Sequence, residues 1–464
     1  MNDPGTERAP SRGALRGWIR PTTSRSRLLS LVIVVAALGA PAAVLRGLCV
    51  GHSCDEEASA ASEVPFCSLP DDLRRLFAAG FEGELHRSPD ILGVTGPTGV
   101  SGRTVFGPDD PASAWPSREG RSTRVPIVFT GAGVDPEASV PDGTGLDDVA
   151  PTIAAVLGFQ RSNPQVRSGV AVEGVASGQP PRLVIEVALK NVGSSDVDAE
   201  PDAWTNLRSL LDDGAGTLEG DVGSIPVEPT ASLTTMGTGG LPNQHGIVGT
   251  ALRDNEGNVV RAWGPRSPVH IIATLPDDLD ERLDEEPRIG LVRTEVSDRG
   301  LIGGNWYVEV DRDEIVTDRR DPAGEVERMI RSGFGDDEVP DVIGVALEGD
   351  AAAVDEQLGS IASQADAAGA TLVVAGSGSI PEPKAGGITA QALVRQLEDA
   401  VEGADPVIDA AAPGGVYLEQ ETLVKSGITE DDVLNAFVDL EGADGRPLFA
   451  DAFPAIAVSF ARYC

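Results

Sequence analysis

Length, composition and charge limit what this chain can be. It has 464 residues, 41% of them hydrophobic, which is enough apolar sequence to bury a large core. Seven of its 36 basic and two of its 73 acidic residues precede residue 47, leaving 29 basic and 71 acidic residues, a net charge of −42. Such a charge repels a phosphate backbone and argues against nucleic-acid binding. Solubility or salt tolerance is the simpler explanation of the acidic composition.

The N-terminus has the pattern of a membrane anchor. Arginines spread over Arg12–Arg27 precede an uncharged apolar run, Leu28–Leu45, which is about long enough to cross a bilayer as a helix. Because basic flanks stay cytoplasmic, we expect a cytoplasmic tail (1–27), a transmembrane helix or signal anchor (28–45), and a single-pass cell-membrane protein whose bulk is extracytoplasmic. A cleaved signal peptide is the alternative, since Ala40–Ala42 has the small-x-small form of a cleavage site.

Four cysteines follow the apolar run: Cys49, Cys54, Cys67 and Cys464. An even number in an oxidising compartment indicates two disulfides, with three possible pairings. Metal binding is the alternative, but neither a Cys-x-x-Cys pair nor a nearby His cluster supports a zinc site. Residues 46–65, rich in Ala, Ser and acidic residues, are predicted to be a linker.

From residue 66 onward, apolar runs typical of strands alternate with amphipathic segments typical of helices. This order predicts an α/β fold with a mostly parallel central sheet flanked by helices on both faces. The predicted strands are Asp90–Thr95, Arg124–Thr130, Leu183–Leu189, His270–Thr274, Ile289–Val292, Trp306–Val310, Asp341–Leu347, Thr371–Ala375 and Ala455–Phe460. The predicted helices are Ser68–Gly80, Leu146–Phe159, Trp204–Gly214, Val326–Ile330, Ala351–Ala367, Ala390–Val401 and Thr429–Leu440.

One segment, Pro229–Gly249, is rich in hydroxyl and small residues and ends in Gly-Leu-Pro-x-x-His-Gly-Ile-x-Gly, which begins at Gly240. It resembles the nucleophile segment of the type I phosphodiesterase/nucleotide pyrophosphatase branch of the alkaline phosphatase superfamily. The strand at Leu183 and the helix after it look like the family's opening elements. The resemblance implies an alkaline-phosphatase-like domain and phosphate-ester hydrolysis.

A second resemblance lies earlier in the chain. Arg124–Val134 followed by Asp148–Gly158 is similar to the family's C-terminal part, which normally comes after the nucleophile. Residues 66–180 therefore look like the end of the family's fold, and residues 181–464 like its beginning and middle. A circular permutation within one domain explains this order.

The permutation has two consequences that the resemblance implies. Pairing of Cys67 with Cys464 would close the old junction. The strand at Ile91 would belong to the same sheet as the strands at Val184, Val342 and Val373.

The family's two-metal centre needs carboxylates and imidazoles, most of which this chain lacks. The resemblance places Lys190 where the family has Asp after its first strand, and Ser377 and Gly378 where it has an Asp-His pair. Arg124 replaces a further His. An ammonium opposes a metal ion instead of binding it, so these positions are vestigial.

The remaining site positions are incomplete. The family's nucleophile aligns with Pro229, so Thr230 or Ser232 could replace it only if the loop shifts. Glu348 and Asp350 survive as possible metal ligands. The chain has four histidines in all: His52, His86, His245 and His270. His245 belongs to the Gly-Leu-Pro turn, where we expect it to hydrogen-bond the loop.

These departures lead to a hypothesis of a degenerate metal site without a metal or other cofactor, in a protein that binds or scaffolds, with a cell-surface protein or an anionic ligand as partner. The alternative is an active phosphodiesterase or phosphatase that uses Thr230 or Ser232 and a divalent metal such as zinc. Lys190 and Arg124 together could bind an anion. In the other interpretation they form a buried salt bridge with Glu348 or Asp350.

Overall fold

The structure is a computed structural model that describes residues 65–96, 100–101, 115–117, 123–284, 286–304, 306–307, 313–380, 387–401, 406–461 and 464. The expected tail, transmembrane helix (28–45) and nearly all of the linker lie outside these residues, as does most of the predicted strand Trp306–Val310. Within the described ranges, no helix has the length and apolarity needed to cross a membrane. Ser62–Cys464 forms one compact unit.

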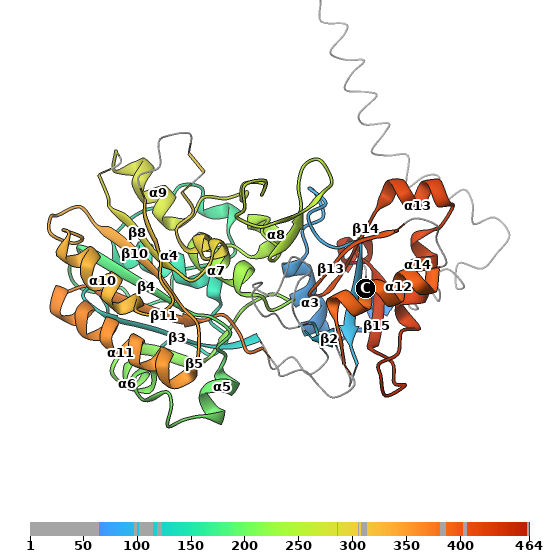
Figure 1. Cartoon of the computed structure of the whole chain (residues 1–464). Coiled ribbons are helices and arrows are strands. Elements are labelled where there is room, and N and C mark those ends of the chain that lie inside the picture. Colours follow the sequence, from blue (N-terminus) through green and yellow to red (C-terminus); the bar gives the residue numbers. More distant parts are fainter. Residues whose placement is uncertain are drawn as a thin grey trace, which may run out of the picture. The chain divides into compact units, whose positions relative to one another are not determined.

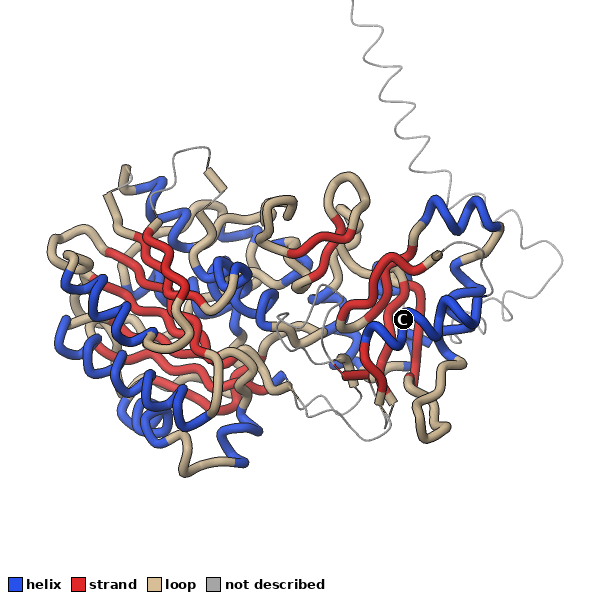
Figure 2. The backbone as a smooth tube through the Cα atoms, viewed as in Figure 1, coloured by secondary structure: helices blue, strands red, loops and turns tan. Residues whose placement is uncertain are grey.

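A seven-stranded sheet in the order β5-β3-β11-β4-β10-β8-β9 forms the centre of this unit (Figures 1 and 2). Its strands are parallel except for β3, which runs antiparallel to both of its neighbours. The mostly parallel α/β fold is thus confirmed. The bounds are β3 Arg124–Gly131, β4 Leu183–Leu189, β5 Ala215–Asp221, β8 Ile289–Arg293, β9 Glu314–Thr317, β10 Asp341–Leu347 and β11 Thr371–Gly376.

Helices cover both faces of this sheet because its inner strands are apolar on both sides. Along β4, Leu183 and Ile185 pack on one face, and Val184 and Ala188 on the other, as the two-residue period of a strand requires. The first face is covered by α6 (Thr205–Asp213), α10 (Pro322–Arg331) and α11 (Ala351–Ala368). The second is covered by α4 (Val149–Val156), α7 (Pro229–Thr238) and α9 (Leu275–Arg282).

A second, four-stranded sheet contains the strand at Ile91, so the prediction that this strand joins the central sheet is wrong. The order is β13-β14-β1-β15, and β1 runs antiparallel to both of its neighbours. Strand pairing depends on partners distant in sequence, which an apolar run does not specify. The bounds are β1 Ile91–Thr95, β13 Ile408–Ala412, β14 Gly415–Leu418 and β15 Phe449–Pro454.

Both faces of the smaller sheet are also covered. Helices α12 (Ala390–Val401), α13 (Gln420–Ser426) and α14 (Glu430–Val438) pack on one face. On the other, α3 (Asp71–Gly80) and the 3₁₀ turn η1 (Pro65–Ser68) join a core that is continuous with that of the central sheet. The remaining elements are short: β2 Val100–Ser101, β6 Ala251–Arg253, β7 Val259–Arg261, β12 Ile388–Thr389, α5 Ser194–Ala199, α8 Pro242–His245, α15 Ile456–Ser459, η3 Leu146–Asp148, η4 Pro164–Val166 and η5 Val296–Leu301.

Two predicted strands are wrong. His270–Thr274 is a loop, because the Thr274 hydroxyl accepts a hydrogen bond from the backbone N–H of Asp277 and so begins helix α9. Ala455–Phe460 contains the helix α15, and the last strand, β15, ends before it at Pro454.

The disulfide between Cys67 and Cys464 is confirmed, with 5.1 Å between the Cα atoms. It joins the two ends of the compact unit. Cys49 and Cys54 lie outside the described residues.

Candidate functional site

The carboxyl ends of adjacent parallel strands bring several predicted site residues to one edge of the central sheet. Lys190 follows β4, Glu348 follows β10, and Ser377 follows β11. Ligands of open α/β sheets commonly bind at this edge. The loop after β8 adds polar residues that sequence reasoning missed, beginning with Thr294.

Lys190 lies at the centre of this group with its side chain fully buried. Its ammonium pairs with Glu295, with Asp298 Oδ1 at 3.0 Å, and with Glu348 Oε2 at 3.3 Å. It also donates a hydrogen bond to Thr294 Oγ1 at 2.9 Å. Burial opposes the charge, but the three carboxylates raise the pKa of Lys190 above its ordinary value. The predicted salt bridge between Lys190 and Glu348 is confirmed.

Arg124 does not join Lys190, and this part of the prediction is wrong. Its guanidinium pairs with Glu219 Oε2 on β5 at 3.3 Å, and both side chains are about half exposed. Only its backbone carbonyl approaches the edge, at Gly193. Asp350 is exposed and stands at the N-cap of α11. Neither residue contributes to the group around Lys190.

The segment that resembles a nucleophile loop is helix α7, and its predicted nucleophiles are enclosed. Thr230 and Ser232 are each 1% exposed. The Thr230 hydroxyl pairs with the Thr250 hydroxyl at 2.7 Å, and Ser232 Oγ donates to the Ser377 carbonyl at 3.1 Å. The helix lies directly on η5, since a Cβ at Gly237 would come within 2.3 Å of a carbonyl there. Protein atoms therefore cover this part of the edge.

Ser377 and Gly378, which stand where the family has metal ligands, have structural contacts. Ser377 Oγ accepts the Asn191 N–H at 2.8 Å, which links the loops after β11 and β4. Gly378 has φ +103°, a conformation that a side chain disfavours. Both residues shape the turn.

His245 hydrogen-bonds its own loop, as predicted. Its Nδ1 accepts the backbone N–H of Ile247 at 3.1 Å, so Nε2 carries the proton and donates to Thr235 Oγ1 at 3.1 Å. Burial, with smaller contributions from His270 and Arg87, lowers the pKa of His245 well below its usual value. A neutral imidazole in this tautomer cannot take the proton of Thr235.

His270 is buried in an aromatic group that no sequence pattern predicted. Its ring packs against those of Trp263 and Trp306, with centroids 5.1 and 5.6 Å away. Its Nε2 is 3.3 Å from Asp277 Oδ2. Trp263, Trp306 and Asp277 thus contact this imidazole, and His270 is 1% exposed.

A second buried ion cluster, also missed, holds the C-terminus of α7. Arg161 and Arg167 both contact Asp278 Oδ2, at 2.8 and 3.2 Å. Both also donate to the Thr238 carbonyl, the last of the helix, and to the Ala273 carbonyl. Burial lowers the pKa of Arg161 to about 10. Guanidinium groups at a helix C-terminus satisfy carbonyls that lack helical partners.

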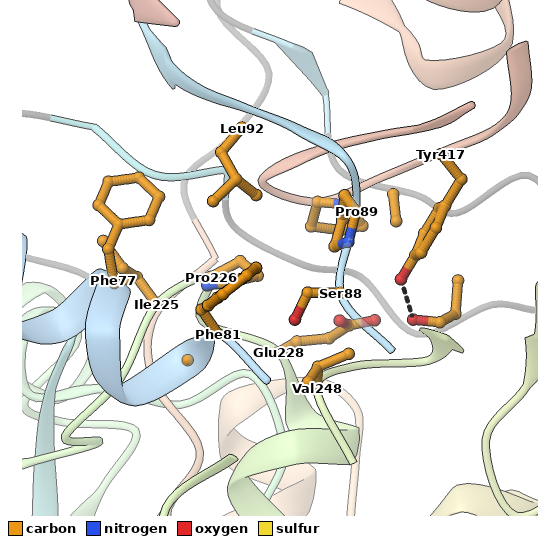
Figure 3. A pocket seen from close by; sticks show the side chains of 14 residues that line it. Phe77, Phe81, Ser88, Pro89, Leu92, Ile225, Pro226, Glu228, Val248 and Tyr417 are labelled. Atoms are coloured by element: carbon orange, nitrogen blue, oxygen red, sulfur yellow. Dashed lines mark hydrogen bonds between the residues drawn. The ribbon is translucent and has the colours of Figure 1, made fainter. Parts of the chain in front are cut away.

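One pocket lies between α3, the start of β1 and the loop before α7 (Figure 3). Figure 3 shows the Glu228 carboxylate and the Ser88 hydroxyl close together among apolar side chains. The positions open to a water molecule amount to about 20 Å³, roughly the room one water needs. The pocket is too narrow for a phosphate ester.

The residues at the sheet edge do not fit the metal centre that the resemblance implies. Within the described ranges, no three His, Cys, Asp or Glu side chains are arranged to hold a metal ion. The three carboxylates that do converge are occupied by the ammonium of Lys190, and two cations repel each other at such distances.

No family model and no curated protein matches the chain. Among solved structures, it is similar to wild-type alkaline phosphatase PafA, with 13% identity and a TM-score of 0.43. It is also similar to a quadruple mutant of that enzyme, with 14% identity and a TM-score of 0.41. Each comparison covers 56% of this chain and 76% of the phosphatase. A likeness of this kind does not indicate activity.

Proposed function

We propose that this chain is a membrane-anchored, extracytoplasmic protein with an alkaline-phosphatase-like domain in permuted order, and that it binds or scaffolds instead of hydrolysing phosphate esters. The motif at Gly240–Gly249 supports the family relationship. The disulfide that joins the two ends of the compact unit is what a permuted chain needs at its old junction.

The main support for the proposed lack of catalysis is that the candidate nucleophiles are buried. A hydroxyl attacks phosphorus only when a base or a metal ion activates it and the substrate can reach it. Ser232 Oγ donates a hydrogen bond to the Ser377 carbonyl, and the Thr230 hydroxyl pairs with that of Thr250. Lys190, where the family has a metal ligand, is itself a cation.

Phosphoester hydrolysis by the purified full chain tests this proposal. We expect no product above background from aryl phosphate monoesters or diesters, with or without Zn²⁺, Ca²⁺ or Mn²⁺. Turnover that Thr230→Ala or Ser232→Ala abolishes would falsify the proposal and identify an active phosphodiesterase. Ser209→Ala, a change on the exposed face of α6, is the matched control.

The membrane location rests on the arginine-flanked apolar run at 28–45. A reporter active only in the cytoplasm should be silent when fused after Cys464, and a working reporter there would reverse the proposed topology.

We favour a cell-surface protein over an anionic ligand as partner. Lys190 is surrounded by carboxylates and Arg124 points elsewhere, so the anion site that these two cations could have formed is not assembled. The net charge of −42 after residue 46 also opposes anionic partners, nucleic acids included.

A further inference from the structure

Two large apolar side chains lie on the exposed side of helix α15, close to the C-terminus. Ile456 is 60% exposed and Phe460 is 55% exposed. Residues four positions apart share one face of a helix, and the Phe460 N–H donates to the Ala457 carbonyl at 3.1 Å, which continues the helical turn. Val458, on the opposite face, is 4% exposed and belongs to the main core. Ile456 and Phe460 therefore form an apolar surface, which we call the α15 face.

The α15 face is fixed in place by the protein around it. The disulfide between Cys464 and Cys67 ties the end of the chain to η1. Helix α15 also packs beside α3 and the loop after it, because a Cβ at Gly83 would lie 3.4 Å from Ser459 Oγ. The apolar pair cannot turn inward unless Val458 leaves the core.

This face lies close to the point at which the predicted linker enters the compact unit. Nineteen residues, 46–64, separate the predicted transmembrane helix from Pro65, the first residue of η1. Cys67 follows two residues later and is the disulfide partner of Cys464, and Phe460 lies four residues before Cys464. A chain of this length without regular structure has an r.m.s. end-to-end distance of about 25 Å. A bilayer that holds the apolar run therefore stays within reach of the α15 face.

The α15 face suits a lipid surface better than a protein partner. A stable protein interface buries about 800 Å² on each side, which is far more than two side chains supply. A bilayer contact needs less area, because a tether raises the effective concentration to roughly the millimolar range. The net charge of −42 after residue 46 repels anionic headgroups. The contact therefore has to come from apolar side chains, which enter the boundary between headgroups and acyl chains.

We propose that the α15 face contacts the bilayer surface and thereby fixes the orientation of the compact unit on the membrane. The inference rests on the anchor in the proposed function and goes beyond it, because a linker alone leaves the compact unit free to rotate. The smaller sheet, whose strand β15 leads into α15, then lies at the membrane end of the unit. Helix α6 and the part of the central sheet that it covers lie at the other end (Figure 1).

Tryptophan fluorescence of the full chain in phosphatidylcholine vesicles tests this contact. Lipids brominated near the headgroup act as the quencher. The tryptophan added by Phe460→Trp should be quenched by on the order of twofold, because an apolar helix face lies about 5–10 Å deep in a bilayer. The wild type gives the quenching of the five native tryptophans, which is subtracted. Ile456→Trp, on the same face, gives a second measurement in case Phe460→Trp does not fold.

Ser209→Trp is the control, because Ser209 is exposed on α6, at the other end of the compact unit from the C-terminus (Figure 1). Its added tryptophan should not be quenched. In an Ile456→Asp/Phe460→Trp double variant, we expect the quenching to disappear, because burying a carboxylate in lipid is costly. The side chain of Ile456 is already 60% exposed, so this change should leave the fold intact.

Flotation of the same samples separates two kinds of failure. A chain that does not float with the vesicles would contradict the membrane anchor, and the inference with it. A floating chain in which Phe460→Trp and Ile456→Trp are quenched no more than Ser209→Trp would overturn the inference alone, and would leave the α15 face to a protein partner. Quenching that survives Ile456→Asp would also overturn it, since the contact would not depend on the apolar pair.

Discussion

The cluster around Asp278 and the cluster around Lys190 are both buried, yet they carry surplus charge of opposite sign. At Asp278, two guanidinium groups share one carboxylate, and backbone carbonyls at the end of α7 and in nearby loops accept the remaining N–H groups. At Lys190, three carboxylates share one ammonium, and the surplus lies on side chains that reach solvent, such as Glu348.

The difference reflects what the backbone can offer. A helix C-terminus presents carbonyls without helical partners. They accept hydrogen bonds from guanidinium groups, so the arginine cluster can be fully buried. Carboxylates need donors, and the turn after β8 supplies backbone N–H groups to Asp298 and only the Thr294 hydroxyl to Glu348. An acidic cluster of this size therefore remains partly exposed to solvent, whereas the arginine cluster is buried.

The largest loss of stability is expected from removing the carboxylate of the buried arginine cluster. Asp278→Ala leaves two buried guanidinium groups without a carboxylate, which should cost about 3–5 kcal/mol of stability. Thermal denaturation and the yield of soluble protein measure the loss. Arg124→Gln is the control, because the exposed pair with Glu219 is worth less than about 1 kcal/mol. Equal stability of the two variants would mean that the backbone carbonyls alone hold the arginines.

A smaller, pH-dependent effect is expected from Glu186, which lies fully buried in β4 on the face that Arg161 approaches. Burial raises its pKa from 4.5 to about 8 despite Arg161. Between these values the folded protein keeps a proton that the unfolded chain releases, so stability falls as pH rises from about 4.5 to about 8.

Glu186→Gln should remove this slope. Relative to the variant, the wild type should lose at most about 4–5 kcal/mol between pH 4.5 and pH 8, measured as the difference in Tm across a pH series. Parallel pH profiles of the two proteins would show that Glu186 is already ionised beside Arg161. The arginine cluster would then carry two carboxylates, and the contrast with the Lys190 cluster would weaken.

Much of the fold could be predicted because its signals are local. The strands β4, β10 and β11 are continuous apolar runs, and Thr429 marks the start of α14 as a capping residue. The resemblance placed Lys190 beside Glu348 or Asp350, and the structure pairs it with Glu348 because β4 and β10 are neighbouring parallel strands.

The site residues after β8 were missed although a signal exists. Thr294, Glu295 and Asp298 follow a predicted strand, where the carboxyl edge collects functional groups. The partners of Asp278 gave no such signal, since Arg161 and Arg167 lie 117 and 111 residues before it. His270 gave none because only folding brings its ring against Trp263 and Trp306.

The sequence by itself determined the α/β class, the alternation of helices and strands, and the shortage of imidazoles for a metal centre. Periodicity, capping and composition are properties of neighbouring residues and survive without a fold. Only the tertiary structure decided that β1 joins a second sheet, that Arg124 pairs with Glu219, and that the Thr230 and Ser232 hydroxyls of α7 are buried. Each of these depends on which distant segments pack together. The free energy of burying a side chain is set by those tertiary neighbours, so local sequence does not determine it.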